Sequence, residues 1–270
     1  MIEKIKTQEE LIQQAPAVFS NVWEQEKLSQ RYKFFPTYKI LDFFENFNWK
    51  PVNAYQSKSR VKNPFTSKHI LRLRHENATA VMPEVGSLIP EIVVKNSHDG
   101  TTGLQIHLGL FRLVCSNGLV VANSMIADFK FRHMGIEMDD IYRVTVQMQN
   151  KFDEIWNKIY EYKTIYLTDK QKLDFATQVV EYNWKNRNMN VEPEKLIIPR
   201  RDIDNADDLF TTYNVIQENL TKGGILYINP RYNTFRYTRR IKDGHRDFNV
   251  NCFLWQLMEN FYKYQKFVVE

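Results

Sequence analysis

The sequence predicts an α+β fold: a central antiparallel sheet with a β-β-β-α-like core, packed with several helices that are mostly C-terminal. Strand-like alternation is confined to two neighbouring stretches, His69–His75 and Glu91–Asn123. Helical spacing of apolar residues dominates from Asp139 to Phe267. Strands and helices are therefore grouped in sequence and do not alternate, which disfavours a doubly wound parallel sheet.

The clearest strand pattern lies between Glu91 and Gly118. Ile92–Val94 is β-branched and apolar, and the Asn, Ser, Asp and Gly residues of Asn96–Gly103 tolerate the backbone angles of a turn. From Leu104 apolar residues alternate with polar ones, which indicates a half-buried strand with a polar face. Asn117-Gly118 is typical of a hairpin turn. These features predict a small antiparallel unit.

The segments before this unit carry helix and strand signals of their own. Thr7 and Glu10 fit a capping box, which predicts a helix from Gln8 towards Val18. A helical spacing of apolar residues follows in Tyr38–Phe47, and Val52–Lys58 is compatible with a strand.

The C-terminal half is predicted to be mostly helical. The expected elements are a long helix capped by Asp139 or Asp140, a helix from Thr168 to Trp184, a connector over Asn186–Pro199, a helix from Asp208 to Leu220 stopped by Gly223-Gly224, and a last helix over Asn251–Phe267.

We expect three parts along the chain. Residues 1–30 form an N-terminal helical segment, and residues 31–165 form the strand-rich core with its long helix. Residues 166–270 form a helical part that makes one compact unit with the core. The length of 270 residues is sufficient for a sizeable hydrophobic core.

The composition narrows the class of protein. Two cysteines far apart, Cys115 and Cys252, make neither a disulfide framework nor a metal site. No apolar run approaches the length that a membrane helix needs, and the N-terminus lacks a signal-peptide core. We therefore expect a protein of a reducing cytoplasm, without a membrane partner, a metal or another cofactor.

The positive charge is segregated into two blocks interleaved with aromatic residues. Ten Lys or Arg lie between Arg31 and His75 against two acids, and a second block extends from Arg231 to Arg246. Lys and Arg neutralise phosphates, and aromatic faces stack on unpaired bases. Either block alone also fits an ordinary solvated basic surface. The candidate nucleic-acid-binding residues are Arg60, Lys62, Arg72, Arg74, Lys95, Arg112, Arg236, Tyr237, Arg239 and Arg240.

A polar turn offers a second kind of candidate site. Asn96, His98 and Asp99 lie in that turn, and Gln217 and Glu218 lie near a helix end. Such side chains more often hydrogen-bond their own backbone, although ligand binding or catalysis also fits them. Nothing has the spacing of zinc ligands. Cys115 fits a buried structural cysteine, because no nearby cation or helix start would lower its pKa.

Four blocks of sequence occur in an order that is typical of a known family. These blocks are Asn96–Gly100, Phe111–Gly118, Tyr213–Gly224, and Arg239-Arg240 with Asn251–Trp255. By them the chain resembles the "phage/plasmid-like protein" family, a domain of unknown function carried by phages, plasmids and other mobile elements. The resemblance extends from about Pro36 to Phe261 and implies a mobile-element setting.

The order of strands and the long helix also resembles the β-β-β-α core of single-strand-annealing recombination mediators. Those proteins bind the DNA backbone in a basic groove and often assemble into rings. This resemblance implies a homo-oligomer that binds single-stranded nucleic acid without enzymatic chemistry. The rival hypothesis is an enzyme or sequestering protein that acts on a nucleotide or nucleic acid to counter host defence. Its site would be the polar turn with Arg112, Gln217 and Glu218.

Overall fold

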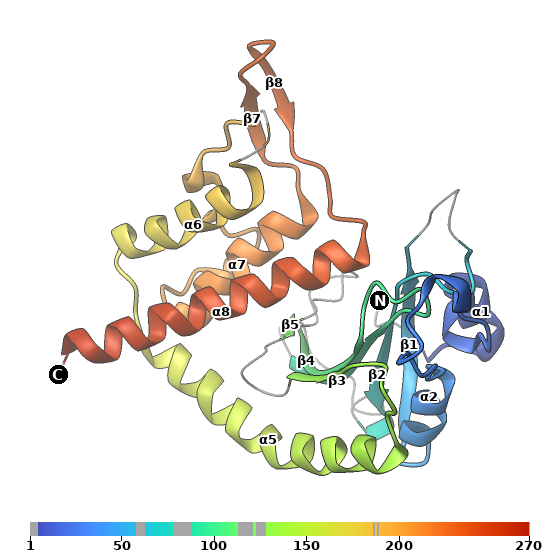
Figure 1. The fold of residues 1–270 in the computed structure, drawn as a ribbon. Helices are drawn as coiled ribbons and strands as arrows, with labels where there is room; N and C mark the ends of the chain where they lie inside the picture. Colours follow the sequence, from blue (N-terminus) through green and yellow to red (C-terminus); the bar gives the residue numbers. More distant parts are fainter. Residues whose placement is uncertain are drawn as a thin grey trace. The chain divides into compact units, whose positions relative to one another are not determined.

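The computed structural model describes residues 5–57, 63–77, 88–112, 121–122, 128–185, 187 and 189–269. The chain divides into two compact units, Met1–Lys151 and Phe152–Glu270, and each is described by itself. The division falls inside the long helix α5 (Met138–Thr164), whereas the sequence placed a boundary at the end of that helix. The predicted α+β class is confirmed (Figure 1).

The first unit contains an antiparallel sheet that has six strands among the described residues. The strands β1 to β4 follow one another as a meander, and β4 also pairs with both β5 and β6. Their bounds are β1 (Trp49–Gln56), β2 (His69–His75), β3 (Leu88–Asn96), β4 (Leu104–Arg112), β5 (Val121–Ala122) and β6 (Asp128–Phe131).

Two strand predictions are confirmed closely, and one is shifted. The strand His69–His75 has the predicted bounds, and the turn between β3 and β4 begins after Asn96. The strand expected over Val52–Lys58 begins instead at Trp49. A bulge between Pro51 and Asn53 admits the proline, which has no N–H for the ladder. The hairpin turn predicted at Asn117-Gly118 lies outside the described residues.

N-terminal helices cover one face of this sheet. Helices α1 (Gln8–Gln14) and α2 (Tyr38–Glu45) contact β1. The hydroxyl of Thr37, at the start of α2, lies 2.7 Å from His69 Nε2 on the sheet face that also carries buried Leu71. Helices α1 and α2 therefore help to cover the apolar side chains of this face.

The predicted capping box at the first helix is confirmed, but the helix is shorter than expected. The Glu10 N–H donates to Thr7 Oγ1 at 3.3 Å, and Glu10 Oε2 accepts from the Thr7 N–H at 2.8 Å. The α-helix ends at Gln14, and a 3₁₀ helix follows over Pro16–Phe19. The proline explains the break, because the residue before a proline is excluded sterically from the α region.

The second unit consists of helices and one hairpin. Helix α7 is buried on nearly every side, and α8 contributes Leu254, Trp255 and Met258 to the core. The helix starts predicted at Thr168 and Asp208 are confirmed: Thr168 forms a capping box with Gln171, and Asp208 is the N-cap of α7. The elements are the end of α5, α6 (Asp169–Trp184), α7 (Leu209–Lys222), β7 (Leu226–Asn229), β8 (Thr234–Tyr237) and α8 (Gly244–Val269).

Helix α8 begins earlier than the predicted Asn251. It starts at Gly244, where Asp243 Oδ1 accepts from the Arg246 N–H at 2.8 Å. The apolar pattern in the first two turns is sparse, so periodicity alone placed the start too late. None of the helices in the described part of the chain combines the length and the apolar character needed to span a membrane.

Candidate nucleic-acid interface

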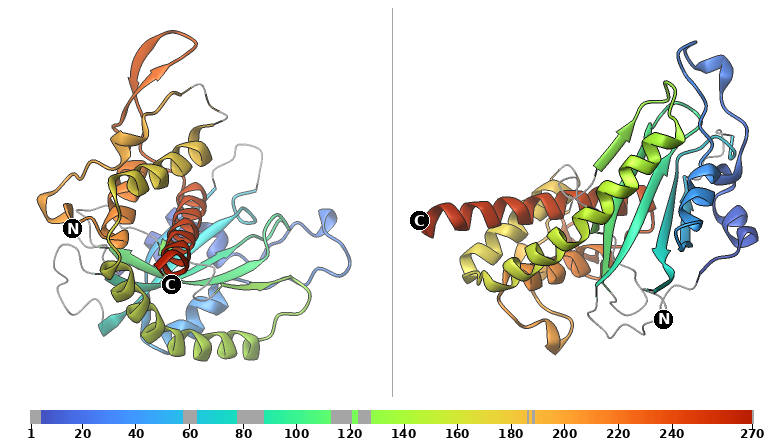
Figure 2. Two further views of the ribbon diagram at one scale, coloured as in Figure 1. Left: turned by 90° about the vertical axis from the view of Figure 1, so that its left-hand side faces the viewer. Right: turned by 90° about the horizontal axis from the view of Figure 1, so that it is seen from below.

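The β7–β8 hairpin is the most exposed regular element of the second unit. Residues 230–237 are all exposed, although they include three large aromatic side chains. Tyr232 is 57% exposed, Phe235 73% and Tyr237 67%. The hairpin extends beyond the helices of its own unit (Figures 1 and 2). Monomeric proteins rarely leave such apolar area uncovered unless it meets a partner.

The pairing register sorts the hairpin side chains onto two faces. Leu226 pairs with Tyr237, and Ile228 pairs with Phe235, so these four side chains share one face. The alternate pair, Tyr227 and Arg236, lies on the opposite face. One face of the ribbon is therefore apolar and aromatic, and the other combines an aromatic ring with a cation.

The second face gathers two guanidinium groups around one ring. The Arg231 and Arg236 guanidinium carbons lie 5.4 Å and 5.7 Å from the centroid of the Tyr232 ring. Cation–π contacts of this length hold the guanidinium groups close to an exposed aromatic surface. The predicted residue Arg236 thus belongs to a cluster with Arg231 and Tyr232, which lie in the predicted basic block but were not among the predicted binding residues.

The turn at the tip is ordered by local chemistry. Asn229 Oδ1 accepts from the Arg231 N–H at 3.0 Å and from the Tyr232 N–H at 3.3 Å. Asn233 adopts a positive φ of 46°, which Asn tolerates better than most residues. The position of Tyr232 is therefore set by an Asn-based turn.

The base of the hairpin is attached to the end of α7. The Gly224 N–H donates to the Thr238 carbonyl at 2.8 Å, and the Thr238 N–H donates to the Ile225 carbonyl at 2.8 Å. Arg200 bonds to Asn219 Oδ1 at 2.6 Å and to the Gly223 carbonyl at 2.5 Å. The outer edge of β7 also pairs with Asn190. The base of the hairpin is therefore hydrogen-bonded to the helical part of the second unit.

Gly223 is required at this junction. It has φ 68° and ψ −153°, a region that is essentially restricted to glycine. A Cβ at this position would lie 2.6 Å from the Arg239 carbonyl carbon and 2.8 Å from the Arg240 nitrogen. The predicted helix stop is confirmed, and it also brings Arg239 and Arg240 against the end of α7.

The cations of this region form no ion pair in the part of the chain that the structure describes. All of them are exposed, so their charge is available to a polyanion. They follow one another along the hairpin and the segment that leads into α8. The set is Arg231, Arg236, Arg239, Arg240 and Lys242.

The prediction that Arg72 and Arg74 face nucleic acid is wrong. Both are buried, with 7% and 3% of their surface exposed, and Glu91 between them is fully buried. Glu91 accepts from Arg72 Nε and Arg74 Nε, each at 2.9 Å. The alternation correctly placed the two arginines on one face of the strand. That face is buried in the folded protein, and both arginines pair there with the Glu91 carboxylate.

Lys95 is the only other predicted cation of the first unit whose side chain lies in the described part of the chain. Lys95 is half-buried and pairs across the ladder with Ile70, on the face that carries Arg72. Arg60 and Lys62 lie outside the described residues, as does the side chain of Arg112. Cys115 also lies outside the described residues.

The polar turn holds strands and N-terminal segments together. Asn96 donates to Thr37 Oγ1 at 2.9 Å, and its Oδ1 lies 2.9 Å from His133 Nε2. His98 Nε2 donates to the Ala17 carbonyl at 2.9 Å, and burial lowers the pKa of His98 to about 4. Asp99 accepts from the Thr101 N–H at 3.0 Å. Asn96 and His98 are fully buried, so they do not face an open pocket.

Gln217 and Glu218 are also buried, on α7 of the second unit. Gln217 hydrogen-bonds Asn251, and Glu218 pairs with Lys222 and, at 3.1 Å, with Arg201. These contacts attach α7 to Asn251 and to Arg201. Within the described residues, no cluster of His, Cys, Asp or Glu has the arrangement of a metal site.

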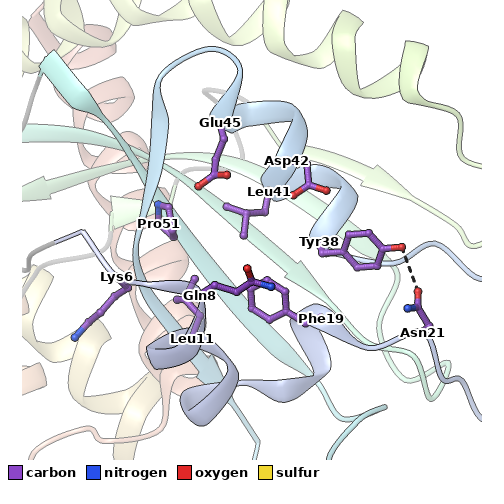
Figure 3. Close-up of a pocket in the computed structure, with 10 residues that line it drawn as sticks. All are labelled: Lys6, Gln8, Leu11, Phe19, Asn21, Tyr38, Leu41, Asp42, Glu45 and Pro51. Atoms are coloured by element: carbon purple, nitrogen blue, oxygen red, sulfur yellow. Dashed lines mark hydrogen bonds between the residues drawn. The ribbon is translucent and has the colours of Figure 1, made fainter.

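A groove of about 400 Å³ lies in the first unit, between α1 and α2 (Figure 3). Leu11, Phe19 and Leu41 contribute apolar surface, while the carboxylates of Asp42 and Glu45 lie along its α2 side. The lining has two carboxylates and one cation, Lys6, and this balance of charge disfavours phosphate groups. This groove is therefore unsuited to nucleic acid, and the β7–β8 hairpin is the better candidate.

The fold and the hairpin define an α+β protein with an exposed cationic and aromatic β-ribbon. The chain belongs to the family described as "Domain of unknown function (DUF932)", which matches residues 25–255. It is 33% identical over 256 residues to the UPF0380 protein YafZ of Escherichia coli (strain K12), and 32% identical over 256 residues to the UPF0380 protein YfjQ of the same organism. Each alignment covers 94% of this chain and 90% of the relative. No solved structure matches the chain significantly.

Proposed function

We propose that this protein binds single-stranded nucleic acid through the β7–β8 hairpin and the cationic segment that follows it. The observation that carries the proposal is the exposed Tyr232 ring, flanked by the guanidinium groups of Arg231 and Arg236. An aromatic ring stacks on an unpaired base, while adjacent guanidinium groups contact the flanking phosphates.

The segment after the hairpin extends this surface. Arg239, Arg240 and Lys242 are exposed and continue directly from β8. The backbone of Arg239 and Arg240 lies against Gly223, so these two residues start from a fixed point at the base of the hairpin. Because these contacts are to backbone phosphates and base faces, we expect affinity with little dependence on base sequence.

The experiment is a fluorescence-anisotropy titration of the full chain with a labelled oligonucleotide at several salt concentrations. Substituting Arg239→Ala and Arg240→Ala removes two phosphate contacts. The slope of log affinity against log salt should fall by about 1.4, from roughly 0.7 per phosphate on single strands. Affinity should fall alike for unrelated sequences.

The matched control is the double variant Lys170→Ala and Lys185→Ala, which also removes two exposed charges from the second unit. Its slope and affinity should stay close to those of the unsubstituted protein. Absence of binding at about 50 mM salt, or binding without salt dependence, would overturn the proposal. Equal losses in both double variants would show a general charge effect and would overturn it as well.

The biological setting is part of the same proposal. The resemblance to the phage/plasmid-like family supports a mobile-element protein, for which assisting annealing or recombination is a suitable task. Annealing brings two strands together, and a homo-oligomer would present several hairpins to them. Native mass spectrometry of the purified protein tests this, since a monomer with no co-purified nucleic acid would contradict the oligomeric arrangement.

A further inference from the structure

Both faces of the β7–β8 ribbon carry exposed aromatic side chains. Phe235 and Tyr237 lie on one face, and Tyr232 lies with Arg236 on the other. A single strand needs only one stacking face. The second face would then be an uncovered apolar surface, which soluble proteins normally avoid.

The two faces differ in a way that suits two different surfaces of a nucleic acid. Among the paired residues of the ribbon, Phe235 and Tyr237 share their face with Leu226 and Ile228, and none of these four side chains is charged. Such a surface suits the end of a duplex, where a terminal base pair offers a broad flat plane without phosphates. The Tyr232 face has guanidinium groups, which suit one separated strand with its phosphates.

The ribbon is attached at its base and ordered at its tip. Its base is joined to α7 through Gly224 and Thr238, and it is braced by Asn190 on the outer edge of β7. The tip is ordered by Asn229. A ribbon attached in this way keeps its orientation when a base pair presses on one face.

We infer that the β7–β8 hairpin is a wedge for junctions between single- and double-stranded nucleic acid. Phe235 and Tyr237 stack on the terminal base pair, and the Tyr232 face receives the strand that leaves the duplex. No chemical step is involved, because each base exchanges stacking on its neighbour for stacking on an aromatic side chain. This inference rests on the proposed binding of single-stranded nucleic acid and names its substrate.

The test compares a DNA fork with the corresponding unpaired strand. The fork carries 2-aminopurine at its terminal base pair, so fluorescence reports unstacking while anisotropy reports binding. The full chain should prefer the fork and brighten the 2-aminopurine. In the variant Phe235→Ala with Tyr237→Ala, the preference for the fork over the unpaired strand should fall about tenfold and the brightening should be lost.

The matched control is Tyr160→Ala with Tyr166→Ala, because both tyrosines are 73% exposed, as Phe235 is. This control should behave as the unsubstituted protein does. Binding to the unpaired strand without preference for the fork, or brightening that survives Phe235→Ala with Tyr237→Ala, would overturn the wedge and leave the proposed function intact. No binding to either DNA would overturn both, and preference for an intact duplex would overturn the wedge.

Discussion

The Gly223 Cα lies so close to Arg239 that a Cβ on the glycine would stand 2.6 Å from the arginine carbonyl carbon. The helix stop after α7 and the cationic segment after β8 are separate in sequence but form one junction in the fold. The end of α7 at Gly223 and the Arg239-Arg240 pair therefore meet at the base of the hairpin.

Replacing Gly223 should lower the free energy of unfolding and weaken nucleic-acid binding. In Gly223→Ala, backbone strain and the contact with Arg239 should together lower the free energy of unfolding by about 3 kcal/mol or more. Gly224→Ala is the control, because Gly224 also has a positive φ of 78° but no atom within 4 Å of an added Cβ. It should lose only about 1–2 kcal/mol from strain. Urea unfolding monitored by circular dichroism measures the free energy of unfolding of the two variants. Equal losses in Gly223→Ala and Gly224→Ala would contradict the close contact at Gly223.

The buried Arg72–Glu91–Arg74 group should govern the stability of the first unit. Glu91→Gln removes the charge that both guanidinium groups share, and breaking a buried ion pair typically costs about 3–5 kcal/mol. Glu45→Gln is the control, because Glu45 is only half-buried and forms no ion pair among the described residues. Its change should stay within about 0.5 kcal/mol. Thermal unfolding compares the two, and a Glu91→Gln protein as stable as the control would argue against the burial of the arginines.

Acid should weaken the first unit through His98. Burial lowers the pKa of His98 to about 4 in the folded protein, against an ordinary value near 6.5. Between pH 4 and pH 6.5 the unfolded chain binds more protons at His98 than the folded protein does. The contribution of His98 to the free energy of unfolding is therefore complete above about pH 6.5 and decreases as the pH drops towards 4. The slope is about 1.4 kcal/mol per pH unit for this group.

His133 acts in the same direction, because burial also lowers its pKa. The check is the pH dependence of urea unfolding in His98→Gln, which removes one titrating group. That variant should show a shallower slope between pH 6.5 and 4 than the unsubstituted protein. An unchanged slope would mean that His98 is not buried in its neutral form.

Local features of the fold were predictable from the sequence because they depend on near neighbours. The capping boxes at Thr7 and Thr168 involve residues three positions apart. The alternation in His69–His75 gave the bounds of β2. The missed features have weak local signals: β6 is only four residues long, and α8 begins with few apolar positions.

The candidate site was predicted only in part, for the same physical reason. Arg236, Tyr237, Arg239 and Arg240 were proposed from charge and aromatic composition, and the structure exposes all four. The hairpin that carries the first two was not predicted, since its strands are short. Arg200 offered no signal, because its role is a contact with the distant Gly223 carbonyl.

The sequence by itself determined the α+β class, the main helices, the meander around the polar turn and the presence of two cationic blocks. The tertiary structure decided what those blocks do. Periodicity states which residues share a face, but the covering of that face depends on segments far away in the chain. Arg72 and Arg74 therefore became buried partners of Glu91, while Arg236, Arg239 and Arg240 remained on the surface.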